Sequence, residues 1–518
     1  MSEIPLLLHT PAELQAWRDA QRRRGTPVHF VPTMGALHQG HQQLIRRAGE
    51  SRGAGQPTVL VSVYVNPLQF GPDEDLARYP RQIQRDCQLA AEAGAAALWA
   101  PTTADIYPAG PAEVTRLAPP ASLLAGLCGA SRPGHFEGVA TVVVRLLSLV
   151  RPERLLLGEK DWQQLVVLRR VLSDLGLPVT IEGCATVRQD DGLALSSRNS
   201  YLNSAELQQA AALPRALQAA QAAATQARDS SALIALVRRQ LEAACLQIDY
   251  VTLVAAHTLK PLPQLGPLAL LAAAVHCGPA RLIDHTFLMT RAPIVAIDGP
   301  AGAGKSTVTK AFARHLGLIY LDTGAMYRAL TWWVQHRGVD PADAAAVAPL
   351  LVGLDLQLGA DQSVRINGHD VSTAIRSPEV TAQVSTVAAH GCVREALTAQ
   401  QQAMGQRGGL VAEGRDIGTA VFPDAELKVF LTATVAERAR RRAQDLRQRG
   451  FAVPELAELE AQIAERDHLD STRAIAPLQQ ADDAVELVTD GMAIEAVIQT
   501  LVDLFRSRIP EDAWPLPG

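Results

Sequence analysis

The sequence predicts an α/β protein made of two successive units, each built around a parallel β-sheet. Apolar, strand-like runs alternate with helix-like segments from the start of the chain, a pattern typical of parallel sheets covered by helices on both faces. A glycine-rich loop then follows a second apolar run, Pro293–Ile297, and precedes a helical pattern at Val308–Leu316. The 518 residues exceed one ordinary core, so two or three domains are expected.

The predicted elements of the first half alternate strand and helix: Val28–Val31, His41–Ala48, Thr58–Val65, Ala77–Ala93 and Ala95–Ala100. A smaller region begins near Thr186, where the alanine- and glutamine-rich stretch Ala205–Leu246 suits helix formation. It ends with three short predicted strands, near Tyr250–Val254, Leu268–Val275 and Ala280–Asp284. No spacer rich in Pro, Gly or Ser follows, so we expect a short tether near residue 290.

Composition argues against several classes of function. The hydrophobic fraction is 48%, the charged fraction 19% and the net charge −5, which gives no reason to expect nucleic-acid or membrane binding through a global field. The longest apolar runs are far too short to span a bilayer, and the N-terminus lacks a signal-peptide layout. The six cysteines form no C-x-x-C pair, so we expect reduced cysteines in a cytoplasmic protein, without a metal or disulfide role.

The glycine-rich loop fits the phosphate-binding pattern G-x-x-x-x-G-K-[ST] and lies between a strand and a helix, as that pattern requires. Its glycines let backbone N–H groups turn toward a polyphosphate, while Lys305 can reach the β/γ-phosphates and Ser306 can ligate Mg²⁺. An ordinary glycine-rich turn is the alternative, but the chain has few lysines to complete the pattern by chance. The predicted nucleotide-binding residues are Gly299, Pro300, Ala301, Gly302, Ala303, Gly304, Lys305, Ser306 and Thr307.

A second candidate site lies near the N-terminus. The segment VPTMGALHQGH, residues 31–41, places a strand end, a glycine turn and two histidines at a helix start. The imidazoles of His38 and His41 could donate to nucleotide phosphates, and Gly40 permits close backbone approach. This motif is weak by itself, because loop histidines that only satisfy local hydrogen bonds would give the same letters.

The rest of the first half resembles pantothenate synthetases (pantoate–β-alanine ligases), members of the nucleotidyltransferase superfamily. Matching segments cover this half in the family's order: PTMGALHQGH (32–41), VNPLQF (65–70), YPR (79–81), SRPGHFEGVATVV (131–143), GEKDWQQL (158–165), GLALSSRNSYL (192–202) and ARLIDH (280–285). The resemblance implies a Rossmann-like domain with a smaller C-terminal subdomain. It also implies two steps: pantoate and ATP form pantoyl adenylate and pyrophosphate, and β-alanine then displaces AMP.

This resemblance assigns roles to the phosphate-binding residues. His38 and His41 stabilise charge on the phosphates, and His41 is also the proton donor. Lys160 binds the ATP phosphates, and a second phosphate-binding loop completes the catalytic set of His38, His41, Lys160, Ser196 and Arg198. The implied ATP-binding residues are Met34, Gly35, His38, Gly40, His41, Gly158, Glu159, Lys160, Asp161, Val187, Leu195, Ser196, Ser197 and Arg198.

The carboxylic-acid substrates imply a further set of residues. Gln69 and Gln164 offer amide groups suited to the hydroxyls and carboxylate of pantoate, and the resemblance also places Gln69 near β-alanine. His135 is either a phosphate ligand or a structural loop histidine. Asp86 is the one carboxylate of its helix that could contact Mg²⁺, although a solvated helix face is the favoured interpretation because neighbouring acceptors are absent.

The second half resembles bacterial cytidylate kinases. The matches span about residues 290–510 and include LDTGAMYR (321–328), VREAL (393–397), GRDIGT (414–419), FPDA (422–425), ERA (437–439) and ERD (465–467). The stretch Leu356–Val371 has Asn367-Gly368 between apolar alternations and predicts a small hairpin insert. Bacterial cytidylate kinases carry an extra sheet at this place.

Phosphoryl transfer between two polyanions needs several guanidinium groups around the transferred group. The resemblance places four arginines near substrate phosphate and one carboxylate near the cytidine. The implied CMP-binding residues are Thr323, Arg328, Arg415, Arg466, Asp470 and Arg473, with Lys305 as the catalytic lysine and Ser306 as the Mg²⁺ ligand. The arginine-rich run Glu437–Arg449 suits a short mobile lid, and a solvated helix is the alternative.

Both resemblances together imply one chain with two activities: a ligase half at 1–291, divided into 1–185 and 186–291, and a kinase half at 292–518. The expected substrates are ATP, pantoate, β-alanine and CMP or dCMP, with Mg²⁺ at both ATP sites and no organic cofactor. A homodimer through the ligase half is also expected. Two alternatives stay open for the second half: a broader pyrimidine monophosphate kinase, or a nucleotide sensor without phosphoryl transfer.

Overall fold

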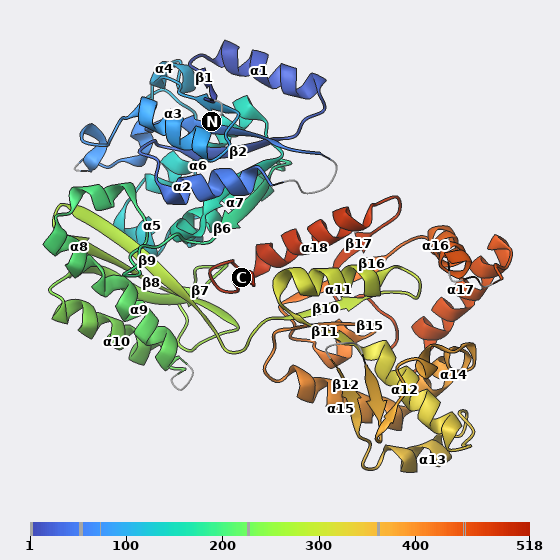
Figure 1. Cartoon of the computed structure of the whole chain (residues 1–518). Helices are drawn as coiled ribbons and strands as arrows, with labels where there is room; N and C mark the ends of the chain where they lie inside the picture. The colour runs from blue at the N-terminus through green and yellow to red at the C-terminus, as the bar shows by residue number, and fades with distance from the viewer. Residues whose placement is uncertain are drawn as a thin grey trace. The chain divides into compact units, whose positions relative to one another are not determined.

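The computed structural model describes residues 4–50, 55–72, 74–224, 228–359, 363–448, 450 and 452–517 (Figure 1). The chain divides into two compact units. Unit 1 comprises Met1–Thr290 together with Pro510–Pro515, and unit 2 comprises Arg291–Ile509 with Leu516–Gly518. The chain therefore passes from one unit to the other three times. A short segment close to the C-terminus is part of the first unit.

Unit 1 contains a six-stranded parallel sheet in the order β1-β4-β3-β2-β5-β6. Its strands are β1 (Leu6–Leu8), β2 (Val28–Thr33), β3 (Thr58–Val63), β4 (Ala97–Trp99), β5 (Arg154–Gly158) and β6 (Thr180–Cys184). The strands β3 and β4 lie on one side of β2, and the later strands β5 and β6 lie on its other side. This reversal opens a crevice at the carboxyl ends of β2 and β5.

Both faces of this sheet are buried. Phe30 and Leu155 belong to one apolar cluster, whereas their neighbours Val31 and Leu156 belong to another. Successive strand residues point to opposite faces, so helices must cover both. The helices of this part are α1 (Pro11–Arg23), α2 (Gln39–Ala48), α3 (Ile83–Glu92), α4 (Thr103–Ile106), α5 (Leu127–Ser131), α6 (His135–Val150) and α7 (Trp162–Asp174).

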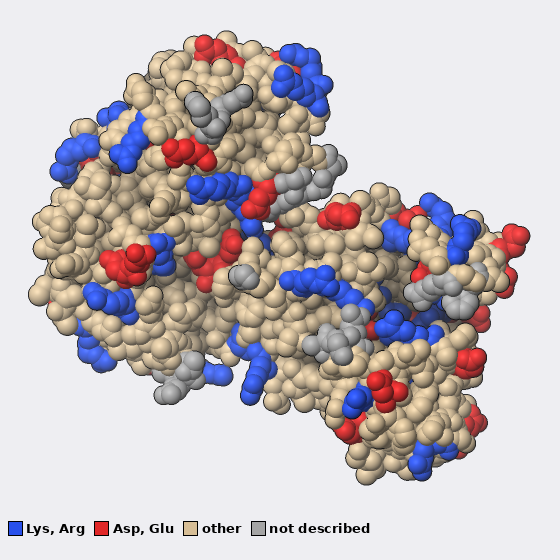
Figure 2. Space-filling view, in the orientation of Figure 1, with Lys and Arg blue, Asp and Glu red and all other residues tan. Residues whose placement is uncertain are grey.

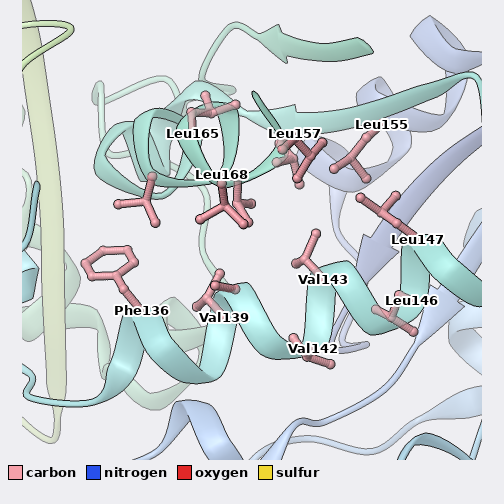
Figure 3. Packing of buried hydrophobic residues seen from close by; sticks show 14 of the residues in the cluster. Phe136, Val139, Val142, Val143, Leu146, Leu147, Leu155, Leu157, Leu165 and Leu168 are labelled. Atoms are coloured by element: carbon pink, nitrogen blue, oxygen red, sulfur yellow. The ribbon is translucent and has the colours of Figure 1, made fainter. Parts of the chain in front are cut away.

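The larger cluster of unit 1 is centred on α6 and α7. Figure 3 shows Val139 and Val143 of α6 turned toward the helix that carries Leu165 and Leu168. All four side chains are buried, and burial of each contributes roughly 1.5–3 kcal/mol relative to exposure. This packing fixes α6 and α7, whose first turns carry residues of the crevice.

The smaller part of unit 1 is an antiparallel sheet packed against helices. The strands β7 (Gln247–Ala255), β8 (Leu268–Cys277) and β9 (Ala280–Met289) pair in that order. A separate apolar cluster joins them to α8 (Ser204–Ala210), α9 (Ala212–Ala223) and α10 (Ser230–Ala243). Arg188, in the loop after β6, forms an ion pair with the buried Asp284 of β9 at 2.7 Å, which anchors that loop to this sheet.

Unit 2 is built on a five-stranded parallel sheet in the order β11-β15-β10-β16-β17. Its strands are β10 (Ile294–Asp298), β11 (Ile319–Asp322), β15 (Leu410–Gly414), β16 (Leu427–Thr432) and β17 (Val485–Val488). The helices are α11 (Lys305–Leu316), α12 (Thr323–His336), α13 (Ala344–Val347), α14 (Pro378–Ala389), α15 (Gly391–Gly405), α16 (Val435–Gln448), α17 (Leu456–Thr472) and α18 (Ile494–Arg508).

A small antiparallel sheet of β12 (Leu356–Leu358), β13 (Val364–Ile366) and β14 (His369–Asp370) forms where the hairpin insert is expected. Asn367 and Gly368 both have positive φ, 46° and 83°, which suits the turn between β13 and β14. The alternating α/β architecture predicted for both halves is confirmed.

Two predicted helices have different bounds in the structure. The segment 77–93 is helical as α3 only from Ile83, because Pro80 fixes its own φ and disfavours helix at the residue before it. The stretch 205–246 is divided among α8, α9 and α10, and residues 225–227 within it lie outside the described part of the chain.

The helices and the surface charge can be compared with the membrane and nucleic-acid classes considered above. Among the described residues, no helix combines the length and apolar character that crossing a membrane requires. On the face seen in Figure 2, acidic and basic side chains are interspersed and most of the surface is neither.

Candidate active sites

Unit 1 holds a cavity of about 700 Å³ at the carboxyl edge of its parallel sheet. Segments that follow the adjacent strands β2, β5 and β6 line it, so it occupies the reversal of strand order where open α/β sheets bind ligands. The sequence-predicted residues that line it are Met34, His38, Gly40, His41, Gln69, Gly158, Lys160, Asp161, Gln164, Val187, Leu195, Ser196, Ser197 and Arg198.

The two histidines are held by the first turn of α2. Nδ1 of His38 accepts the N–H of Gly40 at 3.1 Å, and Nδ1 of His41 accepts the N–H of His38 at 3.3 Å. Because both Nδ1 atoms are acceptors, a neutral ring carries its hydrogen on Nε2 and keeps one donor. A Cβ at position 40 would lie 2.9 Å from Cε1 of His38, so this arrangement requires Gly40.

Burial sets the charge of these rings. Burial, and to a lesser degree the nearby Lys160 ammonium, lower the pKa of His38 to about 4. The pKa of His41 falls to about 3 through burial, the neighbouring His38 and Lys160. Both rings are therefore neutral at pH 7. The site presents two neutral N–H donors and one ammonium, and a polyanion is the ligand that such a set favours.

The second predicted phosphate loop follows the β6 side of the cavity. Ser196 caps a short 3₁₀ turn by accepting the N–H of Arg198 at 3.3 Å. The Arg198 guanidinium makes a two-bond pair with Asp75, at 2.9 and 3.1 Å, and the Tyr201 hydroxyl also donates to that carboxylate. Asp75 therefore fixes the direction of Arg198. The sequence analysis missed Asp75 because it is far from Arg198 along the chain.

Gln69 is placed by a network around its backbone carbonyl. Arg132 donates to this oxygen at 3.2 Å, and Nδ1 of His135 bonds it at 2.8 Å. Arg132 also forms a short two-bond pair with Glu74 and contacts Nε2 of His135 at 3.0 Å. Both ring nitrogens of His135 are thus engaged within the protein, which matches the structural alternative for this histidine.

Two residues predicted to bind ATP are not among those lining the cavity. Gly35 has φ +83°, and a Cβ there would lie 2.9 Å from a Val63 methyl carbon, so it serves the turn itself. Glu159 is only 1% exposed, and its two carboxylate oxygens accept the N–H groups of Glu511 and Asp512, each at 2.8 Å. Those partners belong to the C-terminal segment of unit 1.

The solvated helix face favoured for Asp86 is wrong, because this residue is 1% exposed. Its carboxylate accepts the N–H groups of Ala36 and Leu37, at 3.2 and 2.8 Å, and so braces the turn that leads to His38. These two bonds assign Asp86 to the support of the turn, and its contact with Mg²⁺ stays a prediction.

The glycine-rich loop of unit 2 links β10 to α11 and has the geometry of a phosphate cradle. Gly302 and Gly304 have φ of 77° and 87°, and a Cβ at Gly299 would lie 2.0 Å from the Leu431 carbonyl oxygen. Nζ of Lys305 donates to the Gly299 and Pro300 carbonyls, both at 2.8 Å. Burial and nearby arginine lower the pKa of Lys305 to about 7.

Two carboxylates stand beside this loop. Ser306 Oγ donates to Glu413 Oε1 at 2.5 Å, and burial raises the pKa of Glu413. Asp298, at the end of β10, accepts the N–H groups of Ile417 and Gly418 at 2.8 and 2.7 Å, and burial raises its pKa to about 6. Oxygen ligands of this kind suit Mg²⁺. Sequence reasoning did not identify Glu413 or Asp298.

The predicted arginines of unit 2 are held by carboxylates. Arg415 donates to Asp470 at 3.1 Å, Arg328 to Asp322 at 3.1 Å and Arg473 to Asp416 at 3.3 Å. Arg466 differs from these three, because within the described residues its Nε has no hydrogen-bond partner. Burial, and the positive charges of Arg415 and Arg328, lower its pKa. Arg415, Arg466 and Arg328 therefore form one concentration of positive charge, the kind of site that attracts phosphate.

Other predicted or missed residues complete this region. The Thr323 hydroxyl donates to the Glu413 carbonyl at 2.7 Å, so it joins α12 to β15. Arg438 and Arg441 of α16 donate to the P-loop carbonyls of Ala301 and Ala303, both at 3.2 Å. The predicted lid run therefore contacts the loop through α16, although its residue 449 lies outside the described part of the chain.

Comparisons with known proteins agree with both resemblances. The family model of pantoate-beta-alanine ligases matches residues 6–287, and that of cytidylate kinases matches residues 295–507. A pantothenate synthetase structure from Thermus thermophilus is 45% identical, with a TM-score of 0.51. The match covers 54% of this chain and 98% of that one.

Curated relatives match along the whole chain. The bifunctional pantoate ligase/cytidylate kinase of Parasynechococcus marenigrum is 64% identical over 516 residues, covering 99% of this chain and 100% of the relative. The protein of the same description from Prochlorococcus marinus is 63% identical over 511 residues, covering 98% and 100%. Both halves are thus found joined in the same order, and this chain belongs to the family of bifunctional pantoate ligases/cytidylate kinases.

Proposed function

We propose that unit 1 condenses pantoate with β-alanine through pantoyl adenylate, with the 700 Å³ cavity as its active site. One observation supports this most strongly: neutral His38 and His41 share the cavity with the cation Lys160. A pantoate carboxylate oxygen attacks the α-phosphorus of ATP, the bond to the bridging oxygen breaks and pyrophosphate leaves. The β-alanine amine then attacks the acyl carbon, AMP leaves and the nitrogen loses a proton.

The phosphates are bound by preorganised donors in this scheme. Nε2–H of His38 and His41 donates to the phosphate oxygens as negative charge develops there, while Lys160 neutralises the leaving pyrophosphate. The resemblance assigns His41 as proton donor, and with a neutral ring this role is that of a hydrogen-bond donor through Nε2–H. Arg198, whose direction Asp75 fixes, contributes with Ser196 and Ser197 from the opposite loop.

The carboxylic-acid substrates occupy the part of the cavity that the glutamines line. Gln69 and Gln164 give both donors and acceptors, which match hydroxyl and carboxylate groups of pantoate. Gln69 is also proposed to lie near β-alanine. Its backbone is held by Arg132 and His135, so its side chain starts from a fixed position.

Unit 2 is proposed to transfer the γ-phosphoryl group of ATP to CMP or dCMP. The loop 299–307 cradles the ATP phosphates, which draw Lys305 away from its own carbonyls. Arg328, Arg415 and Arg466 surround the transferred group, and Arg473 and Asp470 are proposed to hold the acceptor nucleotide. The arginine cluster favours transfer over a sensor role, because a sensor needs no acceptor-side cations.

Mg²⁺ is proposed to accompany ATP at both sites. In unit 2 the residues fit the ion: Ser306 supplies a hydroxyl, and Glu413 lies within 2.5 Å of that oxygen and supplies a carboxylate. When bound, Mg²⁺ would neutralise charge on the β- and γ-phosphates.

The organisation of the molecule is proposed as follows. The ligase activity resides in residues 1–291, with subdomains 1–185 and 186–291, and the kinase activity in 292–518. The free cysteines support a cytoplasmic location, because such thiols are typical of reducing compartments.

A homodimer through the ligase half is also proposed. Size measurement by light scattering tests it, and a monomeric mass at micromolar concentration contradicts it.

A product assay tests the two activities. Purified chain is supplied with ATP, Mg²⁺, pantoate and β-alanine, and separately with ATP, Mg²⁺ and CMP. Release of AMP and pyrophosphate in the first mixture, and formation of CDP in the second, are expected. Release of ADP and phosphate with pantoate and β-alanine would instead indicate an acyl phosphate and contradict the adenylate route.

A further inference from the structure

The last residues of unit 1 in the sequence lie beside its nucleotide site. Pro510–Pro515 follows α18 of unit 2 after one residue, Ile509, yet it groups with unit 1. Glu511 and Asp512 donate their backbone N–H groups to the buried Glu159, both at 2.8 Å. A Cβ at Gly183 would lie 2.9 Å from Glu159 Oε1, so a glycine on β6 makes room for this carboxylate.

The side chains of the same two residues hold the loop after β6. Asp512 accepts the N–H of Thr186 at 2.9 Å and its hydroxyl at 2.6 Å. Glu511 accepts the N–H of Ala185 at 3.3 Å. Ala513 packs against the large apolar cluster of the unit. The segment is thus fixed by hydrogen bonds in both directions and by apolar contact.

These partners are immediate neighbours of the residues that line the cavity. Ala185 and Thr186 line it themselves, and Thr186 precedes Val187, one of the predicted ATP-binding residues. Glu159 lies between Gly158 and Lys160, which also line it. Of the three segments that line the cavity after β2, β5 and β6, the C-terminal segment therefore contacts the two that follow β5 and β6.

We propose that Pro510–Pro515, through Asp512 and Glu159, positions the ATP-binding loops of the ligase site. The proposal rests on the proposed ligase function and goes beyond it, because the segment lies outside the ligase half and touches no substrate in this scheme. Asp512 fixes the 185–187 loop. Glu159, held by the two N–H groups of the segment, fixes the turn that presents Lys160.

The physical reason is the burial of Glu159. A carboxylate that is 1% exposed needs partners for its oxygens, and the segment supplies two N–H donors. Without them the carboxylate would turn toward water and carry the backbone of Lys160 with it. The expected result is weaker ATP binding by the ligase, while the pantoate side of the cavity keeps its contacts.

The test uses the full chain with Asp512→Ala and Asp512→Asn. Ala removes both acceptors of Thr186, whereas Asn keeps an oxygen for one of its two donors. We expect KM for ATP in the ligase reaction to rise roughly tenfold in the Ala variant and less in the Asn variant, with KM for pantoate within about twofold of wild type. Asp482→Ala, an exposed carboxylate of unit 2, is the matched control.

CMP phosphorylation by the same preparation reports the concentration of folded unit 2, to which the ligase kcat is normalised. A role confined to stability would lower the active fraction, and hence kcat, without changing KM for ATP, and that outcome would overturn the proposal. An unchanged KM in Asp512→Ala would overturn it as well. If the wild-type chain formed no pantothenate, the proposed ligase function would fail, and that result is seen before any variant is compared.

Discussion

Nδ1 of His41 accepts the backbone N–H of His38 at 3.3 Å, so one helical turn holds both histidines of the ligase site. Their ring centroids are 4.1 Å apart. These local bonds use Nδ1 and leave Nε2 of each ring to face a ligand, and both pKa values lie well below 7. The pair therefore offers neutral donors whose direction is set before ATP arrives.

Replacement of His41 by Ala should remove one of these donors and release the other. We expect a loss of about 3–4 kcal/mol of transition-state stabilisation, which lowers kcat/KM of the ligase roughly 200- to 900-fold. The measurement is AMP formation that depends on pantoate and β-alanine. His9→Ala, an exposed histidine of the same unit, serves as control. A His41→Ala chain with near-normal ligase activity would refute the role.

Replacement of Gly40 by Ala tests the geometry of the turn. The added Cβ would lie 2.9 Å from Cε1 and 3.0 Å from Nδ1 of His38, so the ring must move. We expect ligase kcat/KM to fall at least tenfold, with CMP kinase activity unchanged. Gly126→Ala is the control, because a Cβ there meets nothing within 4 Å and its φ is −141°. Equal ligase activity in both variants would show that His38 tolerates displacement.

The pH dependence of the C-terminal segment follows from Glu159. Burial and the negative charge of Asp512 raise the pKa of Glu159 to about 7, whereas an unfolded glutamate titrates near 4.5. Glu159 therefore binds its proton more tightly when the segment is docked against it than when the chain is unfolded. The stability of the docked segment is greatest below about pH 4.5 and falls as pH rises through about 7, by at most about 1.4 kcal/mol per pH unit.

Hydrogen exchange of the Glu511 and Asp512 amides measures this effect, after correction for intrinsic exchange rates. We expect their protection factors to decrease between pH 6 and pH 8 in the wild-type chain. In Glu159→Gln the decrease should be absent, because the side chain no longer titrates. The other charged groups that act on Glu159 are Asp512, Glu511 and Arg169, and the variant retains all three. A wild-type profile that is flat, or that rises with pH, would contradict the assignment.

The sequence is informative where function depends on local spacing. The glycine turn before α2 and the loop before α11 are complete within a few residues, so their motifs predict both the elements and the donors. Asp86 shows the limit. Its helix was recognised, but its partners Ala36 and Leu37 lie about 50 residues earlier, and nothing in the local pattern points to them.

Glu159 shows the same limit over a longer distance. Its motif places it in a nucleotide-binding turn, but its carboxylate bonds to amides more than 350 residues later in the chain. The segment that carries those amides has no periodicity and no motif. Pairing of this kind depends on tertiary packing, so it becomes visible only when both segments are placed in space.

The acceptor site of unit 2 gives the last prediction. Guanidinium groups bind any monophosphate, so discrimination must come from groups that contact the base and sugar. Asp470, 7% exposed and held by Arg415, is proposed as such a group. A site that hydrogen-bonds the amino group of cytosine leaves a buried polar group unpaired with uracil. We therefore expect good phosphorylation of CMP and dCMP, poor phosphorylation of UMP and almost none of AMP.

Arg473 is proposed to bind the acceptor and not ATP. Its guanidinium donates to the Ala476 carbonyl at 2.7 Å and to Asp416 at 3.3 Å, whereas Lys305 donates to the Gly299 carbonyl. Arg473→Ala should raise KM for CMP about 10- to 100-fold and lower kcat, with KM for ATP nearly unchanged. Arg407→Ala, an exposed arginine of the same unit, is the control. A rise in KM for ATP alone would assign Arg473 to the ATP site. For the base preference, equal kcat/KM for UMP and CMP in the wild-type chain would indicate a broader pyrimidine kinase.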